Sequence, residues 1–197
     1  MKIKTALSLG VMAGLGTLTT VGAWSQLTPG ELSEDVGVAM VMYYNPANAP
    51  ANIDESDVKQ AVEKWNQARA NITIQYGGLT DAPLSKWQGY KDELNVIAWS
   101  IPGQSAPLGN ANFSWDECDV QLGSWPYDWE YHQLDNVLTH EVGHCLGLGH
   151  SQVPGAMMWF AANVTRVELT RDDVEGLRAL YPKAGKWHRT WAAGVGK

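Results

Sequence analysis

An eleven-residue stretch in the second half of the chain constrains its fold more than any other feature. It reads HEVGHCLGLGH from His140 to His150. On an α-helix, His140 and His144 lie four residues apart and project from one face. Gly147 accepts the left-handed backbone conformation that commonly ends a helix, and a turn there carries His150 back toward the other two histidines. The stretch therefore predicts a helix that ends in a tight turn and brings three imidazoles together.

Three imidazoles in this arrangement form a ligand set for zinc. Histidine nitrogens hold zinc at about 2.0–2.1 Å, and three protein ligands leave a fourth position open, as in catalytic rather than structural zinc sites. Glu141 follows the first ligand and lies beside the metal, where it can accept a proton from water. The alternative is a polar helix face with ordinary histidines. It is disfavoured because three of the chain's five histidines fall within eleven residues.

The residues after the third histidine resemble those of metzincin zinc peptidases of the matrixin type. Matrixins place a serine directly after the third histidine, then four residues, then an A-L-M turn and an aromatic residue. These positions are occupied here by Ser151, Ala156, Met158 and Trp159, with Met157 in place of the leucine. Astacin-like enzymes have glutamate and adamalysin-like enzymes aspartate in place of the serine, so Ser151 favours the matrixins. Ordinary core packing would place Met158 in nearly the same way.

A second part of the resemblance lies near the C-terminus. The segment from Leu169 to Tyr181 reads LTRDDVEGLRALY and resembles the last helix of the matrixin domain, L-S-x-D-D-x-x-G-I-x-x-L-Y. In that family an aspartate at this place supports the methionine turn or the N-terminus of the chain. Asp172 and Asp173 are therefore structural candidates near the site. The resemblance is tight from about residue 134 to residue 181.

The resemblance implies an α+β fold of the metzincin (zincin) type, with a twisted, mostly parallel five-stranded sheet, one antiparallel edge strand and three helices. It also implies that the edge strand binds an extended substrate peptide by strand addition. Asn110 and Ala111 fall where this strand is expected, and a simple surface hairpin is the alternative for them. Trp159 is expected on the wall of the specificity pocket and Asn136 near its base.

Residue patterns predict where the elements of this fold lie. Short apolar or alternating runs predict strands at residues 36–44, 72–76, 95–99, 108–113 and 119–122. Helical spacing predicts helices at residues 58–68 and 130–146, and a third that starts at residue 169 or 170 and ends before the proline at 182. Asp54 or Ser56 is expected to cap the first helix. The pair Gly77 and Gly78 is expected to end the second strand.

The N-terminus is predicted to direct export. Lys2 and Lys4 precede an apolar run at residues 6–21 and a small-residue site ending at Ala23, the pattern of a signal peptide at residues 1–23. Glycines and threonines within the run disfavour a membrane anchor, and no other segment is long and apolar enough for a membrane span. We therefore expect a secreted protein, either extracellular or in the periplasm of a Gram-negative host. It would have one metallopeptidase domain at residues 24–182 and a short tail at 183–197.

The net charge of the chain disfavours some classes of binding partner. The formal net charge of −7 becomes −9 once the two signal lysines are removed. An acidic surface of this kind disfavours nucleic acid and anionic membranes as partners. The expected partner is a protein or peptide substrate, and the expected state is a monomer.

The two cysteines, Cys118 and Cys145, both lie in the exported part of the chain. In an oxidising compartment they are expected to form one disulfide, which typically adds about 2–4 kcal/mol of stability. The alternative is a cysteine switch, in which a propeptide thiolate blocks the metal of a matrixin zymogen. That switch uses a P-R-C-G-x-P-D motif that this sequence does not contain, so we do not expect it.

One catalytic Zn²⁺ is the metal that the resemblance implies. Vertebrate matrixins also hold a structural zinc with three further histidines and an aspartate, whereas only His132 and His188 remain here, so no such site is expected. Ca²⁺ stays open, because aspartates and backbone carbonyls suffice to bind it. The tryptophan-rich run at residues 125–131 is interpreted as core and hairpin packing, with a substrate-facing rim as the alternative.

These features together predict a secreted zinc-dependent endopeptidase in which Glu141 is the general base. We expect its activity to fall below about pH 6, as the ligand histidines become protonated and release the metal. The main alternative is a secreted, non-catalytic binding module on a metzincin scaffold, which the presence of Glu141 disfavours. An enzyme for a non-peptide amide or for a single protein target is a second alternative. It stays open because ligand geometry reports chemistry rather than substrate.

Overall fold

The computed structural model describes residues 38–85, 92–103, 106–113, 117–123, 131–160 and 168–183. The predicted signal peptide, the tryptophan-rich run up to residue 130 and the tail beyond residue 183 lie outside these residues. The predicted domain limits, the signal peptide and the role of the tryptophans therefore stay predictions.

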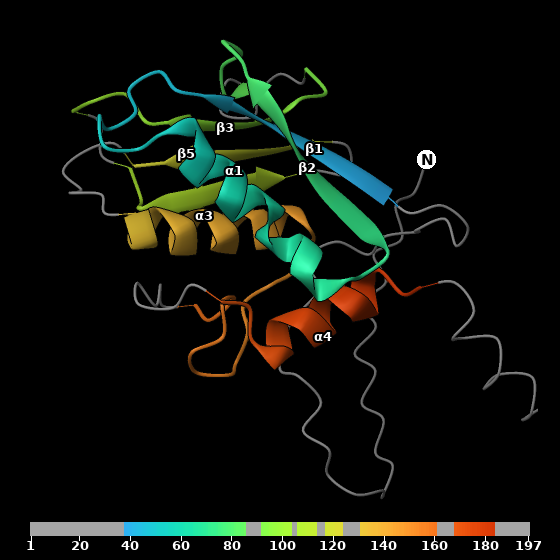
Figure 1. The fold of residues 1–197 in the computed structure, drawn as a ribbon. Coiled ribbons are helices and arrows are strands. Elements are labelled where there is room, and N and C mark those ends of the chain that lie inside the picture. The colour runs from blue at the N-terminus through green and yellow to red at the C-terminus, as the bar shows by residue number, and fades with distance from the viewer. Residues whose placement is uncertain are drawn as a thin grey trace, which may run out of the picture.

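Five strands form one twisted sheet, which is at the top of the view in Figure 1. They are β1 (Val38–Asn45), β2 (Ile72–Leu79), β3 (Asn95–Trp99), β4 (Gly109–Phe113) and β5 (Cys118–Leu122). Their order across the sheet is β2-β1-β3-β5-β4. β1 runs parallel to β2 and β3, and β3 runs parallel to β5, whereas β4 is antiparallel to β5. The prediction of a mostly parallel sheet with one antiparallel edge strand is confirmed.

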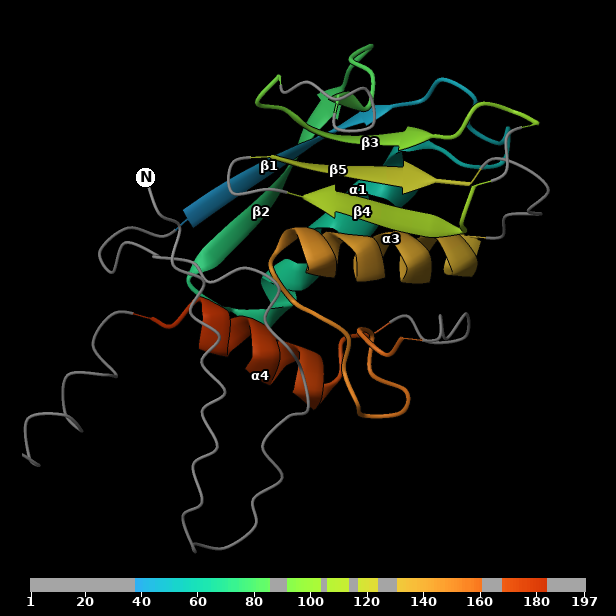
Figure 2. The same cartoon turned by 180° about the vertical axis from the view of Figure 1, so that it is seen from behind.

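Helices cover one face of this sheet. In the described part of the chain they are α1 (Glu55–Glu63), which continues into the 3-10 helix η1 (Lys64–Ala68), α3 (Tyr131–Cys145) and α4 (Arg171–Leu180). α1 connects the parallel strands β1 and β2, as a parallel connection requires. Figures 1 and 2 show α1 and α3 against the sheet and α4 beyond them, on the side away from the sheet. None of the helices in the described ranges has the length and apolar character needed to cross a membrane.

The hydrophobic core lies between the sheet and the two helices α1 and α3. Trp65 of η1 is fully buried, and its indole Nε1 donates a hydrogen bond to the backbone oxygen of Thr139 in α3 at 2.8 Å. Thus the segment that follows α1 is fastened to the helix that carries the histidines. The other large buried side chains come from every layer, and they include Met42, Tyr44, Val62, Ile97, Leu122, Leu134, Leu138 and Leu177.

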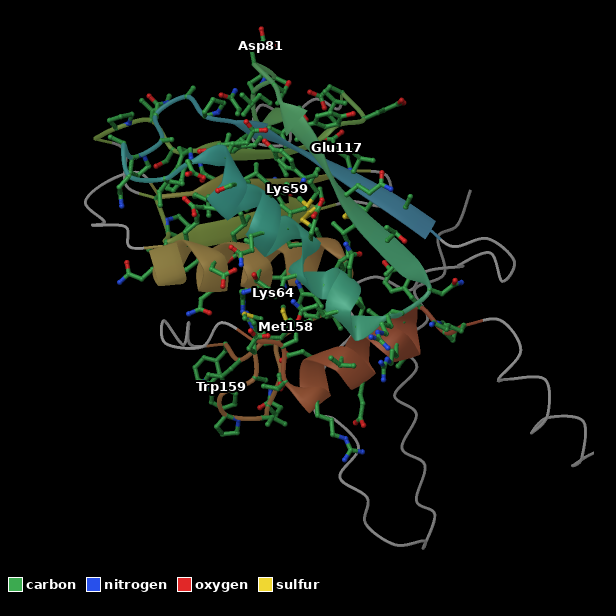
Figure 3. All side chains as sticks on the ribbon, in the orientation of Figure 1. Lys59, Lys64, Asp81, Glu117, Met158 and Trp159 are labelled. Atoms are coloured by element: carbon green, nitrogen blue, oxygen red, sulfur yellow. A yellow bond between two sulfur atoms is a disulfide. The ribbon has the colours of Figure 1, made fainter. Side chains whose placement is uncertain are left out.

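A buried ion pair joins the same two segments. Lys64 of η1 and Asp135 of α3 are only 6% and 2% exposed, and the Lys64 Nζ donates a hydrogen bond to Asp135 Oδ2. Figure 3 labels Lys64 just below α3. The second carboxylate oxygen of Asp135, Oδ1, is buried without a hydrogen-bond partner. No sequence pattern predicts this pair, because its two members are 71 residues apart.

Asp54 is confirmed as the cap of the first helix, which begins at Glu55, whereas the second strand ends later than predicted. Asp54 caps α1 by accepting hydrogen bonds from the backbone of Ser56 and Asp57. The prediction that Gly77 and Gly78 end the second strand is wrong, because β2 continues to Leu79. Gly78 has a positive φ of 97°. A Cβ at Gly77 would lie 2.6–2.8 Å from side-chain atoms of Tyr43 and Val41, so Gly77 allows close approach to β1. A Cβ at Gly78 would meet no atom within 4 Å, and Gly78 lies where the register between β1 and β2 shifts, as in a β-bulge.

The predicted disulfide is present. Cys118, the first residue of β5, is bonded to Cys145, the last residue of α3, and their Cα atoms are 5.5 Å apart. It therefore links the sheet covalently to the end of the histidine-bearing helix. Because Cys145 follows His144 directly, the link is made next to a predicted metal ligand.

Candidate metal centre

The three predicted ligands come together at the end of α3. His140 and His144 are on the helix, and His150 follows after the helix has ended. The nitrogen atoms that these residues can offer lie within 4.8 Å of one another. The imidazole centroids are 4.7, 4.9 and 5.4 Å apart. Within the described ranges, this is the group of three or more histidine, cysteine or acidic side chains that is close enough to hold a metal.

A glycine turn delivers the third histidine. Gly147 has a φ of 87°, in the left-handed region that favours glycine. Its backbone N–H donates to the His144 oxygen at 2.9 Å, and the Leu148 N–H donates to the Gly143 oxygen at 3.0 Å. These are the two hydrogen bonds of a Schellman motif, which satisfies carbonyls at the end of the helix and reverses the chain.

Backbone carbonyls orient two of the three imidazoles. Nδ1 of His140 lies 2.8 Å from the Met157 oxygen, and Nδ1 of His144 lies 2.8 Å from the Leu148 oxygen. A carbonyl can only accept a hydrogen bond, so each Nδ1 carries the proton and each Nε2 presents a lone pair. Burial lowers the pKa of His144 to about 4 and holds the pKa of His140 below its ordinary value. Both rings are therefore neutral at pH 7, which is the state that binds a metal.

The donor set fits zinc. Three imidazole nitrogens suit this ion, and in a tetrahedral site they would lie roughly 3.3 Å apart. Donors already within 4.8 Å of one another reach that separation by small side-chain rotations. The three histidines leave one of four positions for a further ligand. His188 and the side chain of His132 lie outside the described residues.

A methionine turn lies under the histidines, and Figure 3 labels its Met158 below α3. Met158 is 1% exposed. The backbone N–H groups of Met157 and Met158 both donate to the carboxylate of Asp173 at 2.9 Å. A Cβ on Gly143 of α3 would collide with the Met158 sulfur and lie 2.7 Å from the Trp65 ring, so only glycine lets the turn close on the helix.

Glu141 lies between the histidines and the edge strand. Its side chain is 8% exposed and accepts a hydrogen bond from the Ala111 backbone of β4. Burial raises the pKa of Glu141 to about 7, and the hydrogen bond from Ala111 only partly offsets this effect. β4 approaches α3 closely, since a Cβ on Gly109 would lie 2.9 Å from Glu141 Oε1 and 2.5 Å from Val137. Figure 2 shows β4 directly above α3.

All four residues predicted to bind substrate lie in the described part of the chain, with different degrees of burial. Asn110 is exposed and Ala111 is partly buried on β4, which is an edge strand. Trp159 is partly buried, and its ring centroid is 4.6 Å from that of Phe160. Asn136 is 4% exposed, and both polar atoms of its amide are buried without a hydrogen-bond partner.

Two features of the site have little or no signal in the sequence. Phe160 is 62% exposed, and its place after Trp159 is the only mark of it in the sequence. Asp172 contacts the His150 turn by accepting a hydrogen bond from the Ser151 hydroxyl. The sequence predicts Asp172 near the site, and Ser151 only as a mark of the matrixin type.

Four features together define a metzincin. They are the mostly parallel sheet, the histidine pair on the helix, the third histidine beyond the glycine turn and the methionine beneath the histidines. A family model described as Matrixin matches residues 44–182. The chain belongs to the matrixin family. This family implies zinc as the metal of the histidine triad.

Several known proteins are similar to this chain. Matrix metalloproteinase-27 of Tupaia belangeri is 28% identical over 153 residues, which are 72% of this chain and 28% of that protein. Interstitial collagenase of Equus caballus is 31% identical over 153 residues, 70% of this chain and 31% of that protein. The chain thus spans less than a third of the length of these curated relatives. Among solved structures, archaemetzincin from Methanopyrus kandleri has a TM-score of 0.49 and 19% identity, covering 76% of this chain and 98% of that one.

Proposed function

We propose that this protein is a secreted zinc-dependent endopeptidase that hydrolyses peptide bonds in proteins. One observation carries the proposal. Glu141 is buried beside the histidine triad and is held there by the backbone of the edge strand β4. A carboxylate fixed between a metal ligand set and the edge strand has little structural purpose, whereas it suits proton transfer at a scissile bond.

His140, His144 and His150 would hold the zinc ion. When bound, zinc supplies Lewis-acid chemistry, which polarises the scissile carbonyl and makes water a better nucleophile at neutral pH. The carboxylate of Glu141 then accepts the proton of the attacking water and passes it to the nitrogen of the leaving amine. The Met157 and Leu148 carbonyls keep the first two imidazoles in the tautomer that leaves Nε2 for the metal.

The edge strand is the proposed binding place for an extended peptide. In the described sheet β4 pairs with β5 alone, so its other edge presents backbone N–H and C=O groups without a strand partner. Such an edge binds an extended chain by strand addition. Asn110 and Ala111 would contact the peptide, and Trp159 and Asn136 would line the pocket for one of its side chains.

Export is the second part of the proposal. The signal-peptide pattern at residues 1–23 supports it. The disulfide between Cys118 and Cys145 agrees with it, since such bonds persist in oxidising compartments and are rare in the cytosol.

Metal removal tests the function directly. Purified protein without residues 1–23 is expected to cleave members of a diverse peptide library, and a zinc chelator is expected to abolish this cleavage. Re-addition of one equivalent of Zn²⁺ should restore it. The products are identified by mass spectrometry, and the cut sites describe the pocket near Trp159.

Two results would count against the endopeptidase. Cleavage that survives complete zinc removal would point to a contaminating enzyme or to another chemistry. Stoichiometric zinc without cleavage of any library member would favour the binding module, or an enzyme with a single target. A pull-down with the zinc-loaded protein would then separate those two possibilities.

The pH dependence of activity is expected to follow Glu141 rather than the ligands. Burial raises the pKa of Glu141 to about 7, and the positive charge of a bound zinc ion would draw this pKa down toward the usual 4.5. The base works only when ionised, so activity should fall as the pH drops through that range. Burial lowers the pKa of His144 to about 4, so this ligand should stay neutral and keep the metal over most of it.

The sequence alone predicts that activity falls below about pH 6 because metal is lost. The structure leads us to expect protonation of Glu141 as the cause instead. The measurement is a profile of kcat/KM against pH, with zinc content determined at each pH. Activity should decline while zinc remains bound. Zinc release in step with activity would assign the acid limb to the ligands instead.

A further inference from the structure

The third histidine is held differently from the other two. Nδ1 of His140 and Nδ1 of His144 are each fixed by a backbone carbonyl at 2.8 Å. Within the described ranges no hydrogen bond orients the His150 ring, and His150 is exposed. Its place beside the other two rings therefore depends on the backbone on either side of it.

Ser151, the next residue, is buried and held by several hydrogen bonds. It is 0% exposed. Its Oγ donates to Asp172 Oδ2 at 2.6 Å and accepts from the Val153 N–H at 2.9 Å. Its own N–H donates to the Met158 oxygen at 2.7 Å, and Ser151 forms a β-bridge with Trp159. Both its backbone and its side chain are therefore fixed on the turn that carries His150.

Asp172 of α4 accepts the hydrogen bond from the Ser151 hydroxyl and so connects the His150 turn to this helix. It lies in the first turn of α4, where a carboxylate is favoured by the helix dipole, and it is 7% exposed. Its neighbour Asp173 holds the two N–H groups of the methionine turn. The oxygen of Met157 in that turn in turn orients His140. Two adjacent carboxylates thus support two different metal ligands.

We propose that Ser151 and Asp172 are positioning residues for the third metal ligand, His150. The inference rests on the proposed function only in taking zinc as the ion that the triad binds. The hydrogen bond from a hydroxyl to an ionised carboxylate is a strong one, and it fixes the turn at the residue after the ligand. Partners that orient a ligand typically change metal affinity about 10–100-fold when they are removed. The pair therefore determines how tightly the centre holds zinc.

Zinc affinity, measured by competition with a chromophoric chelator at neutral pH, tests this proposal. Ser151→Ala is expected to weaken zinc binding about 10–100-fold relative to the unchanged protein. Asp172→Asn keeps an oxygen acceptor but loses the charge, so a smaller loss is expected. Ser151→Thr keeps the hydroxyl and should restore most of the affinity.

Ser85 provides a matched control. It is also 0% exposed, and its Oγ donates to a buried carboxylate, Glu117 Oε1, at the same 2.6 Å. Ser85→Ala should therefore lower the unfolding temperature of the metal-free protein to a similar extent as Ser151→Ala. Its zinc affinity should not change.

A second background shows whether Ser151 acts through His150. In His150→Ala the ligand is gone, so adding Ser151→Ala should cause no further loss of zinc affinity. An equal loss in both backgrounds would overturn the proposal, as would an unchanged affinity in Ser151→Ala alone. If Ser151→Ala does not fold, the comparison of Asp172→Asn in the two backgrounds decides in the same way.

The outcomes also separate this proposal from the proposed function. Zinc binding that depends on Ser151 in a protein that cleaves no peptide would contradict the endopeptidase and support the positioning role. Peptide cleavage with a zinc affinity that does not depend on Ser151 would support the endopeptidase and contradict the positioning role. A triad that binds no zinc in the unchanged protein would overturn both.

Discussion

Glu141→Gln is expected to lower kcat/KM for peptide cleavage by a factor on the order of 10²–10⁴ and to leave zinc bound. The amide keeps the size of the side chain and an oxygen that can accept the Ala111 N–H, but it cannot take up a proton. None of the three histidines is altered, so zinc affinity and zinc stoichiometry should stay close to those of the unchanged protein. The measurements are cleavage kinetics on a peptide identified in the library, and zinc content.

The same substitution is expected to maintain or raise stability. Burial raises the pKa of Glu141 to about 7, which means that the folded protein disfavours the ionised carboxylate. A neutral amide at this position removes that cost, as is common where function opposes stability. A Glu141→Gln protein that unfolds at a lower temperature, or that loses zinc, would show that the residue serves the fold. Unchanged cleavage would exclude Glu141 as the base.

Lys64→Met is expected to destabilise the fold by about 3–5 kcal/mol, because it leaves the buried carboxylate of Asp135 without its cation. Both side chains are almost fully buried, so water does not compensate the lost partner. A domain of this size is usually stable by about 5–15 kcal/mol in total, so a loss of this size is a large share of it. Urea unfolding followed by circular dichroism gives the change in the free energy of unfolding.

A double substitution separates the ion pair from simple packing. Lys64→Met with Asp135→Leu replaces the pair by apolar side chains, which is often neutral or stabilising, and it also removes the partnerless Oδ1 of Asp135. The double variant should therefore be much more stable than either single variant. Arg171→Met is the exposed comparison, because Arg171 pairs with Glu175 at the surface and its loss should change stability little. Single-variant losses as small as that of Arg171→Met would contradict the prediction.

Local spacing explains why so much of the metal centre is predictable from the sequence. The ligands His140, His144 and His150 lie within eleven residues, and the helix and glycine turn between them follow from short-range rules. The disulfide is predictable because only two cysteines exist and the predicted compartment favours their pairing. The mostly parallel sheet with one antiparallel edge strand follows from the family resemblance, since runs of apolar residues locate strands but do not pair them.

The features that the sequence does not reveal depend on contacts between distant segments. Lysines usually lie at the surface, and only the fold places Lys64 against Asp135. The pair Gly77 and Gly78 predicts a strand end, and only the neighbouring strand shows that Gly77 allows close approach and that Gly78 lies at a register shift. Ser151 identifies the family in the sequence, but its link to Asp172 requires that α4 pack beneath the His150 turn. In each case only tertiary packing shows the role of the residue, because local sequence patterns do not distinguish between the possible roles.

The bond between Cys118 and Cys145 has a consequence for what happens when a protease cuts the chain. It encloses the whole stretch of chain between β5 and the end of α3, which includes the segment that enters α3. A single cut anywhere inside that loop would produce two pieces that stay joined by the sulfur bridge. The nicked molecule would keep the sheet and the ligand-bearing helix on one covalent frame, and it would separate into fragments only in a reducing environment. A single proteolytic cut in this loop would therefore not separate the protein into fragments until the disulfide is also reduced.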